Sequence, residues 1–179
     1  MILPWRQVTI DGGPPVNTSL TSTEGEILRE LARGRHVLEI GSAYGYSAIV
    51  MAQTAESVTA VDPHEGYGAM PGSLDIMRGH LIDYDAWANV TVWQTVSSDA
   101  LATLALDGRA FGLVFIDGDH RASAVRADVA GALELLADGG VLAVHDFGEI
   151  SCPDVTKVLA SEYGHLDHEI IDTLWVHRT

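Results

Sequence analysis

Acidic residues and histidines follow two of the apolar runs in this sequence. Asp117 and His120 come after one run, and the pair His145-Asp146 comes after a later one. Because the carboxyl ends of parallel strands meet at one edge of a sheet, we expect these side chains to converge. Two carboxylates repel each other unless a proton or cation lies between them, and oxygen ligands suit Mg²⁺. The pattern predicts a divalent metal at Asp117 and Asp146, with His120 as the base.

Each of these residues also has a structural interpretation. An aspartate at a strand end is a common helix N-cap, and a single histidine often only completes a hydrogen-bond network. We favour a functional role for the two acids and leave His120 and His145 open. Without a metal, one of these two histidines must remove the proton from the substrate.

A glycine-containing turn follows the first apolar run, in the segment Glu39-Ile40-Gly41-Ser42-Ala43-Tyr44-Gly45-Tyr46-Ser47. Gly41 and Gly45 allow a tight turn and a close approach to a ligand, while the following helix presents free N–H groups. The Gly-x-x-x-Gly spacing differs from the Gly-x-Gly-x-x-Gly of dinucleotide sites, and no Gly-Lys-Ser/Thr follows. A nicotinamide dinucleotide is therefore disfavoured.

Polar residues also follow the next two runs. Asp62 lies 21 positions after Gly41, where a carboxylate can accept hydrogen bonds from both hydroxyls of a ribose. His64 is expected to face solvent. Ser98 and Asp99 either contact a nucleobase or form the N-cap of a helix that starts at Ala100.

Short apolar runs predict seven strands, five of them buried on both faces of a parallel sheet. The runs are His36–Ile40, Val58–Val61, Val90–Gln94, Leu113–Ile116, Val141–Val144, Glu169–Ile171 and Leu174–His177. Helical patterns lie between them, at Tyr46–Ala55, Leu74–Trp87 and Ala122–Leu136, and a Thr23 to Glu26 capping box opens a further helix before Gly34. This alternation predicts an α/β fold with an open doubly wound sheet.

Two connections stand out by their composition. Only Asp172 and Thr173 separate the last two strands, so these strands are expected to form an antiparallel hairpin. The loop Pro63–Gly72 is rich in glycine and proline and is expected to lie at the surface and close over a ligand.

Composition limits the class of protein. The 179 residues predict one domain, 1–179, and the formal net charge of −15 disfavours nucleic acids and anionic membranes as partners. A single cysteine excludes an internal disulfide, and no signal sequence or long apolar stretch is visible, so we expect a cytoplasmic protein.

The sequence contains the segments VLEIGSAYGYSAIVMA, VTAVDPH and GLVFIDGDHRASAVRADVAGALELLADGGVLAVHDF. Together they resemble a class I S-adenosylmethionine-dependent methyltransferase. Within this class the chain is similar to small bacterial O-methyltransferases related to the catechol and caffeoyl-CoA enzymes, including a subgroup with an Ile-Asp-Gly-Asp-His segment. The resemblance covers Thr21 to about Thr179.

The resemblance implies a Rossmann-like seven-stranded sheet in the order 3-2-1-4-5-7-6, with strand 7 antiparallel. It also implies that the methionine end of the cofactor, its ribose and its adenine contact Glu39, Gly41, Ser42, Ala43, Tyr44, Gly45, Ser47, Asp62, Ser98, Asp99 and Asp117. Metal-dependent relatives often have Asp-Asn or Glu-Asp where this chain has His145-Asp146 or Asp146-Phe147, so the third metal ligand is altered or absent.

The expected activity is methyl transfer from S-adenosylmethionine to a small molecule, at a hydroxyl oxygen. Two alternatives remain open: methylation of nitrogen on a small molecule, and a non-catalytic module that binds the cofactor. The N-terminal segment 1–20 is expected to contribute to the acceptor site or to an oligomer contact, and a homodimer is left open.

Overall fold

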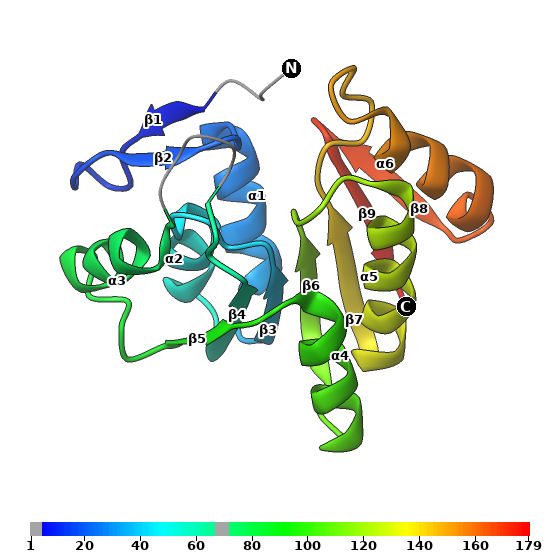
Figure 1. The fold of residues 1–179 in the computed structure, drawn as a ribbon, viewed down its shortest axis with the longest axis horizontal. Coiled ribbons are helices and arrows are strands. Elements are labelled where there is room, and N and C mark those ends of the chain that lie inside the picture. The colour runs from blue at the N-terminus through cyan, green and yellow to red at the C-terminus, as the bar shows by residue number, and fades with distance from the viewer. Residues whose placement is uncertain (1–4, 67–71) are drawn as a thin grey trace.

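The computed structural model describes residues 5–66 and 72–179, and seven of its strands form one mixed sheet. The sheet has the order β5-β4-β3-β6-β7-β9-β8 (Figure 1). Its strands are β3 (His36–Ile40), β4 (Ser57–Asp62), β5 (Val90–Gln94), β6 (Phe111–Ile116), β7 (Leu136–Val144), β8 (His168–Ile171) and β9 (Leu174–Arg178). Counted from β3, this is the predicted order 3-2-1-4-5-7-6. The pairing of β9 with both β7 and β8 is antiparallel, as predicted.

Helices cover both faces of the sheet because consecutive strand residues point to opposite sides. Leu113 and Phe115 of β6 pack into one hydrophobic core, and Val114 and Ile116 pack into the other. The first core includes α1 (Ser22–Ala32), α2 (Tyr46–Ala52) and α3 (Leu74–Asp83), to the left in Figure 1. The second includes α4 (Ser97–Leu106), α5 (Ala122–Leu135) and α6 (Pro153–Val158), which continues as a π-helix, Leu159–Tyr163.

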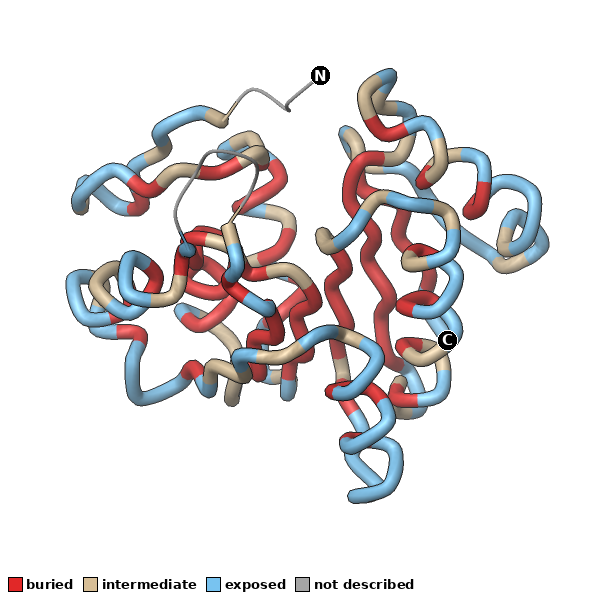
Figure 2. The backbone as a smooth tube through the Cα atoms, in the orientation of Figure 1, coloured by how far each residue is buried: buried red, intermediate tan, exposed pale blue. Residues whose placement is uncertain are grey.

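The register of the sheet brings three strand ends to one edge. Ile40 of β3 pairs with Ile116 of β6, and Ile116 pairs with Val144 of β7. Figure 2 shows that β3 and β6 are buried along nearly their whole length, and β7 is buried over its last five residues. The residues that follow, Asp117 and His145, therefore emerge side by side from the core.

The capping box of α1 lies two residues earlier than predicted. Thr21 is the N-cap, and its side chain accepts a hydrogen bond from the Glu24 backbone N–H, while the Glu24 carboxylate accepts from the Thr21 N–H. The prediction of Thr23 with Glu26 was therefore wrong. Both pairs have the Thr-x-x-Glu spacing, and local sequence cannot choose between them.

Several element boundaries also differ from prediction. Helix α2 ends at Ala52 instead of Ala55, and α3 ends at Asp83 instead of Trp87. Asp85, with φ of +53°, adopts a left-handed conformation that is incompatible with continued helix. Helix α4 begins at Ser97 instead of Ala100.

A short hairpin precedes α1 and was not predicted. Strands β1 (Arg6–Val8) and β2 (Val16–Thr18) pair antiparallel as a separate two-stranded sheet. Three-residue strands carry almost no periodicity, although Asp11-Gly12 between them is a common turn dipeptide. The hairpin brings part of the N-terminal segment close to the edge where Asp117 lies, since Ser19 Oγ is 3.5 Å from Asp117 Oδ2.

Candidate active site

The turn after β3 is folded against the ends of the two neighbouring strands. The Gly41 N–H donates to the Val61 carbonyl at 2.8 Å, and the Asp117 N–H donates to the Ile40 carbonyl at 2.8 Å. Gly41 has φ of +89°, and a Cβ there would lie 2.1 Å from the Asp117 carbonyl oxygen. A residue larger than glycine therefore does not fit between the turn and β6.

Asp62 organises the same turn from the end of β4. Its carboxylate is buried and accepts hydrogen bonds from the Ala43 N–H at 2.9 Å and the His64 N–H at 2.6 Å. Ala43 has φ of +43°, so this hydrogen bond helps to hold an unfavourable backbone conformation. A carboxylate has further acceptor positions for the hydroxyls of a ribose, the role that the resemblance gives to Asp62.

We expect Asp62→Ala to weaken the binding of S-adenosylhomocysteine by about 1–3 kcal/mol, because the amides of Ala43 and His64 lose their acceptor. Titration calorimetry measures this loss directly. Asp83→Asn, which changes an exposed acid at the end of α3, is the matched control and should bind like the parent. Equal affinity of the Asp62→Ala variant and the parent would contradict the assignment of Asp62.

Glu39 is completely buried in β3 next to this turn. Burial raises the pKa of its carboxyl to about 8, the nearby Ser47 hydroxyl opposes part of this shift, and the charges of Asp117 and Asp62 add to it. Within the described residues, neither Glu39 carboxyl oxygen has a hydrogen bond of ordinary geometry, and the buried Ser42 hydroxyl also lacks one. Such polar atoms fit a ligand that brings an ammonium group and hydroxyls.

We expect Glu39→Gln to stabilise the ligand-free protein above pH 8. The ordinary carboxyl pKa is 4.5 and the folded-state pKa is about 8, so the free energy of unfolding of the parent falls as the pH rises between these values. The glutamine variant lacks this fall, and the difference amounts to a few kcal/mol, since each pKa unit is worth about 1.4 kcal/mol. Urea unfolding at pH 4 and pH 9 tests the prediction; a stability difference that is the same at both values contradicts it.

The remaining residues expected at the cofactor follow the carboxyl ends of β3 and β5, and their roles stay predictions. Tyr44 is buried, and its ring packs edge-on against Trp5 with 5.2 Å between ring centroids. Gly45, with φ of +90°, is the N-cap of α2. Ser98 and Asp99 are exposed in the first turn of α4, whose N-cap is Val96, so neither is an N-cap.

His64 was expected to face solvent, and this expectation was wrong. Its side chain is fully buried, and its Nδ1 lies 2.8 Å from the Ser73 hydroxyl. Burial lowers the pKa of its imidazole. The contact joins the two ends of the loop Pro63–Gly72. The predicted closure of this loop falls on residues 67–71, which lie outside the described structure.

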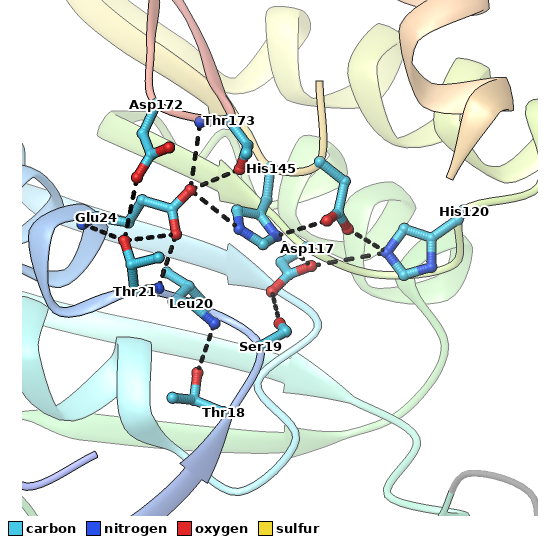
Figure 3. A network of polar contacts seen from close by, with 11 residues as sticks. Thr18, Ser19, Leu20, Thr21, Glu24, Asp117, His120, His145, Asp172 and Thr173 are labelled. Atoms are coloured by element: carbon cyan, nitrogen blue, oxygen red, sulfur yellow. Dashed lines mark hydrogen bonds and ion pairs between the residues drawn. The ribbon is translucent and has the colours of Figure 1, made fainter. Parts of the chain in front are cut away.

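The acids and histidines at the ends of β6 and β7 form one buried network (Figure 3). His145 Nδ1 lies 3.2 Å from Asp117 Oδ1 and 3.4 Å from Asp146 Oδ1. His120 Nε2 lies 2.7 Å from Asp146 Oδ2 and 3.8 Å from Asp117 Oδ1. The side chains therefore converge as the strand pattern predicted.

Glu24 completes this network and was not recognised from the sequence as a site residue. It is buried at the start of α1, and its Oε1 lies 3.3 Å from His145 Nε2 and accepts a 2.5 Å hydrogen bond from the Thr173 hydroxyl. The same carboxylate accepts from the Thr21 N–H at 2.8 Å. The Thr21-x-x-Glu24 spacing was the available signal, but it indicates only a helix start.

The three carboxylates hold both histidines in the charged form. Burial opposes a charge on His120, but Asp117 and Asp146 outweigh it and raise the pKa of the His120 imidazole to about 10. Burial likewise opposes a charge on His145, yet Asp117, Asp146 and Glu24 raise its pKa well above the ordinary value. Burial raises the pKa of Glu24, but His145, Thr173 and Thr21 reverse this and lower it to about 2.

The arrangement fits a hard divalent metal poorly. Ligand atoms of Asp117, His145 and Asp146 do lie within 4.8 Å of one another. Both carboxylates, however, already contact imidazole rings, and a protonated imidazole has no lone pair for a metal. The rings supply the positive charge that two neighbouring carboxylates require. A metal at Asp117 and Asp146 stays a prediction. The geometry favours the histidines as the positive groups between these two carboxylates.

A cavity of about 140 Å³ opens beside the network. Glu24, His145 and Asp146 form one wall, and Arg6 of β1 and Ser19 contribute from the N-terminal segment. The cavity is smaller than the roughly 300–1,000 Å³ pockets that hold drug-sized ligands. It can hold a small molecule, or the reacting end of a larger one, against the histidine cluster.

Comparison with known proteins identifies the class. The profile of a family described as "Methyltransferase domain" matches residues 38–147, more than half of the chain. The chain therefore belongs to this family, and its seven-stranded sheet is that of the class I S-adenosylmethionine-dependent methyltransferases. The matched range includes Gly41, Asp62, Asp117 and His145 but excludes Glu24.

Solved structures with the same fold include methyltransferases with bound cofactor. Cofactor-bound Rv0187 from MTB is 25% identical, with a TM-score of 0.73 over 89% of this chain and 80% of that one. An O-methyltransferase from Bacillus cereus in complex with SAH is 18% identical (TM-score 0.70, 89% and 82% covered). TomG from Streptomyces achromogenes, an O-methyltransferase of tomaymycin synthesis in complex with SAM, is 19% identical (0.69, 89% and 81%). No curated protein matches the sequence.

In the described parts of the chain, no helix combines the length and the apolar character that a membrane span requires.

Proposed function

We propose that this chain transfers a methyl group from S-adenosylmethionine to a hydroxyl oxygen of a small molecule, with His120 as the general base. One observation carries the proposal. The turn at Gly41 touches the backbone of Asp117, because a Cβ on Gly41 would lie 2.1 Å from the Asp117 carbonyl oxygen. The expected cofactor turn and the acid–histidine network are therefore direct neighbours.

The residues of the cofactor side fit S-adenosylmethionine. Among the buried polar side-chain atoms without hydrogen bonds in the described chain, those of Glu39, Ser42 and His64 lie around the turn that Asp62 supports. Bound there, S-adenosylmethionine supplies a methyl carbon that its sulfonium makes electrophilic. The chain itself then has two tasks, to orient the acceptor and to take up the hydroxyl proton.

Geometry distinguishes the two histidines. His145 is buried, and its two ring nitrogens face Glu24 on one side and Asp117 and Asp146 on the other. Such a ring has no free position for another proton, so its role is to balance the charge of Asp117 and Asp146 and to hold them in place. His120 is about one-third exposed and contacts carboxylates through Nε2. Because these contacts leave its other ring nitrogen free of any carboxylate of the described residues, His120 is a better proton acceptor than His145.

The rate is expected to rise with pH. At neutral pH only a small fraction of His120 is neutral, because its pKa is about 10 and only the neutral form accepts a proton. We expect kcat/KM to increase by about tenfold per pH unit from pH 7 to pH 9 and to level off near pH 10. Initial rates across this range test the prediction. A rate that is already maximal at pH 7 contradicts a role for His120 as base.

The decisive experiment has two parts. Titration calorimetry with S-adenosylhomocysteine and with NAD tests the cofactor, and binding of NAD alone would refute the proposal. Incubation with methyl-labelled S-adenosylmethionine and panels of alcohols, phenols and amines, followed by mass spectrometry, tests the reaction. Methylation of the amines alone would favour methyl transfer to nitrogen, an alternative expected from the sequence. Cofactor binding without any product would favour a non-catalytic module, an alternative that the charged state of both histidines supports.

The nature of the partners is part of the proposal. The net charge of −15 disfavours nucleic acid as the acceptor, because affinity for a phosphate backbone depends on positive side chains. The small size of the cavity supports a small-molecule acceptor. The cytoplasmic location and the homodimer stay predictions.

A further inference from the structure

Asp128 is a buried acid that the proposed mechanism does not use. It belongs to α5, is 2% exposed, and its Oδ1 has no hydrogen-bond partner among the described residues. Burial raises the pKa of its carboxyl to about 6, the Ser97 hydroxyl opposes part of this shift, and the charge of Asp119 adds to it. No cation of the described residues offsets its charge. A carboxyl group buried in this way costs stability, so its retention requires a reason.

Helices α4 and α5 pack side by side and both begin at the carboxyl edge of the sheet. A Cβ on Gly131 of α5 would lie 2.9 Å from Leu101 Cδ1 of α4. Asp128 lies three residues before Gly131, and Ser97 lies four residues before Leu101, so both are about one turn nearer to the edge. There the Ser97 hydroxyl forms a hydrogen bond with the Asp128 carboxyl.

Asp128 also lies behind the loop that faces the cofactor turn. A Cβ on Gly118 would lie 3.6 Å from Asp128 Oδ2. Gly118 in turn touches Gly41, because a Cβ on Gly41 would lie 2.7 Å from the Gly118 Cα. The Asp128 side chain therefore supports two segments at once, the backbone next to the Gly41 turn and the first residue of α4.

The start of α4 belongs to the expected cofactor side. Asp62, the acid expected at the ribose, pairs with Gln94 at the end of β5, and Ser97 follows three residues later. Ser98 and Asp99 come next, are exposed, and are the residues expected at the adenine. The position of this first turn therefore sets the distance between the ribose side and the adenine side.

We propose that Asp128 is a positioning residue for the adenosine end of S-adenosylmethionine and acts through Ser97 and the backbone of Gly118. This inference rests on the proposed function and adds a residue to its cofactor side. The buried side chain of Asp128 does not contact the cofactor itself. It holds the first turn of α4 at a fixed position relative to Gly118, as hydrogen bonds from a second layer of residues commonly do behind a binding site.

Titration calorimetry with two probes tests this role. The probes are S-adenosylhomocysteine and 5′-methylthioadenosine, which lacks the amino acid end. We expect Asp128→Ala to weaken the binding of both by roughly tenfold, the usual effect of losing a hydrogen bond to a charged group. Asp128→Asn should restore most of the affinity, because the amide keeps the size of the side chain and an oxygen that accepts from Ser97.

Further variants separate positioning from stability. Ser97→Ala should weaken binding as Asp128→Ala does, and the double variant should bind no more weakly than Asp128→Ala, since both changes remove one interaction. Leu135→Ala is the control. It removes buried apolar contacts at the far end of α5, so it should lower the Tm and yet bind both probes like the parent.

Four results would overturn the inference: parent-like affinity of Asp128→Ala, no recovery in Asp128→Asn, additive losses in the double variant, or an equal loss in Leu135→Ala. If Asp128→Ala does not fold, Ser97→Ala decides, and parent-like affinity of that variant overturns the inference. Failure of the parent to bind S-adenosylhomocysteine would instead overturn the proposed function.

Discussion

The Gly41→Ala variant is expected to lose about 3 kcal/mol or more of stability and its cofactor binding. A Cβ at this position would lie 2.1 Å from the Asp117 carbonyl oxygen and 2.6 Å from its carbonyl carbon, and both atoms belong to the backbone directly after β6. They cannot move aside as the end of a flexible side chain can. The φ of +89° adds strain for any residue with a Cβ. We expect a loss of about 3 kcal/mol or more, a large part of the roughly 5–15 kcal/mol that stabilises a typical domain.

A matched variant separates the steric overlap from the backbone strain. Gly34 also has a positive φ, +64°, but a Cβ there would meet nothing within 4 Å. Gly34→Ala should therefore cost only about 1 kcal/mol, from strain alone. Thermal unfolding followed by circular dichroism compares the two variants. Equal losses would show that the turn does not touch β6 as described.

The second large effect concerns the reaction. With the best acceptor found, His120→Ala is expected to lower kcat by roughly 10²–10⁴-fold, the usual effect of removing a general base. Activity should survive EDTA, because His120 and His145 supply the positive charge between Asp117 and Asp146. His165→Ala, which changes an exposed histidine outside the network, is the control and should retain full activity.

Asp146→Asn distinguishes a histidine base from a metal most sharply. Asp146 is one of the two carboxylates that raise the pKa of His120, so its neutralisation should move the pH profile to lower values. In a metal mechanism the same variant would behave like removal of the metal, since an amide binds a hard cation less strongly than a carboxylate. Loss of activity in EDTA with recovery in Mg²⁺ would establish the metal. Indifference to EDTA and to both histidine substitutions would exclude both mechanisms.

Local sequence determined the sheet and the position of the site within it. Near-continuous apolar runs such as Leu113–Ile116 form buried parallel strands, because only a position covered on both faces removes all their side chains from water. The residue after each run must then lie at the carboxyl edge of the sheet. For this reason the sequence alone assigns Asp62, Asp117 and Asp146 to one edge, and the two-residue connection at Asp172 requires a hairpin.

Tertiary structure decided which groups meet and in which charge state. Glu24 and His145 are 121 positions apart in sequence, yet they lie 3.3 Å apart because α1 packs beside the turn between β8 and β9, where Thr173 donates to Glu24. Periodicity carries no information about such a contact, and the Thr-x-x-Glu spacing shared by two pairs could not place the capping box. Burial similarly made His64 an internal residue. The pKa of His120 depends on carboxylates from two different strands. Electrostatic interactions depend on distance and on exclusion of water, and both quantities exist only once the chain has packed.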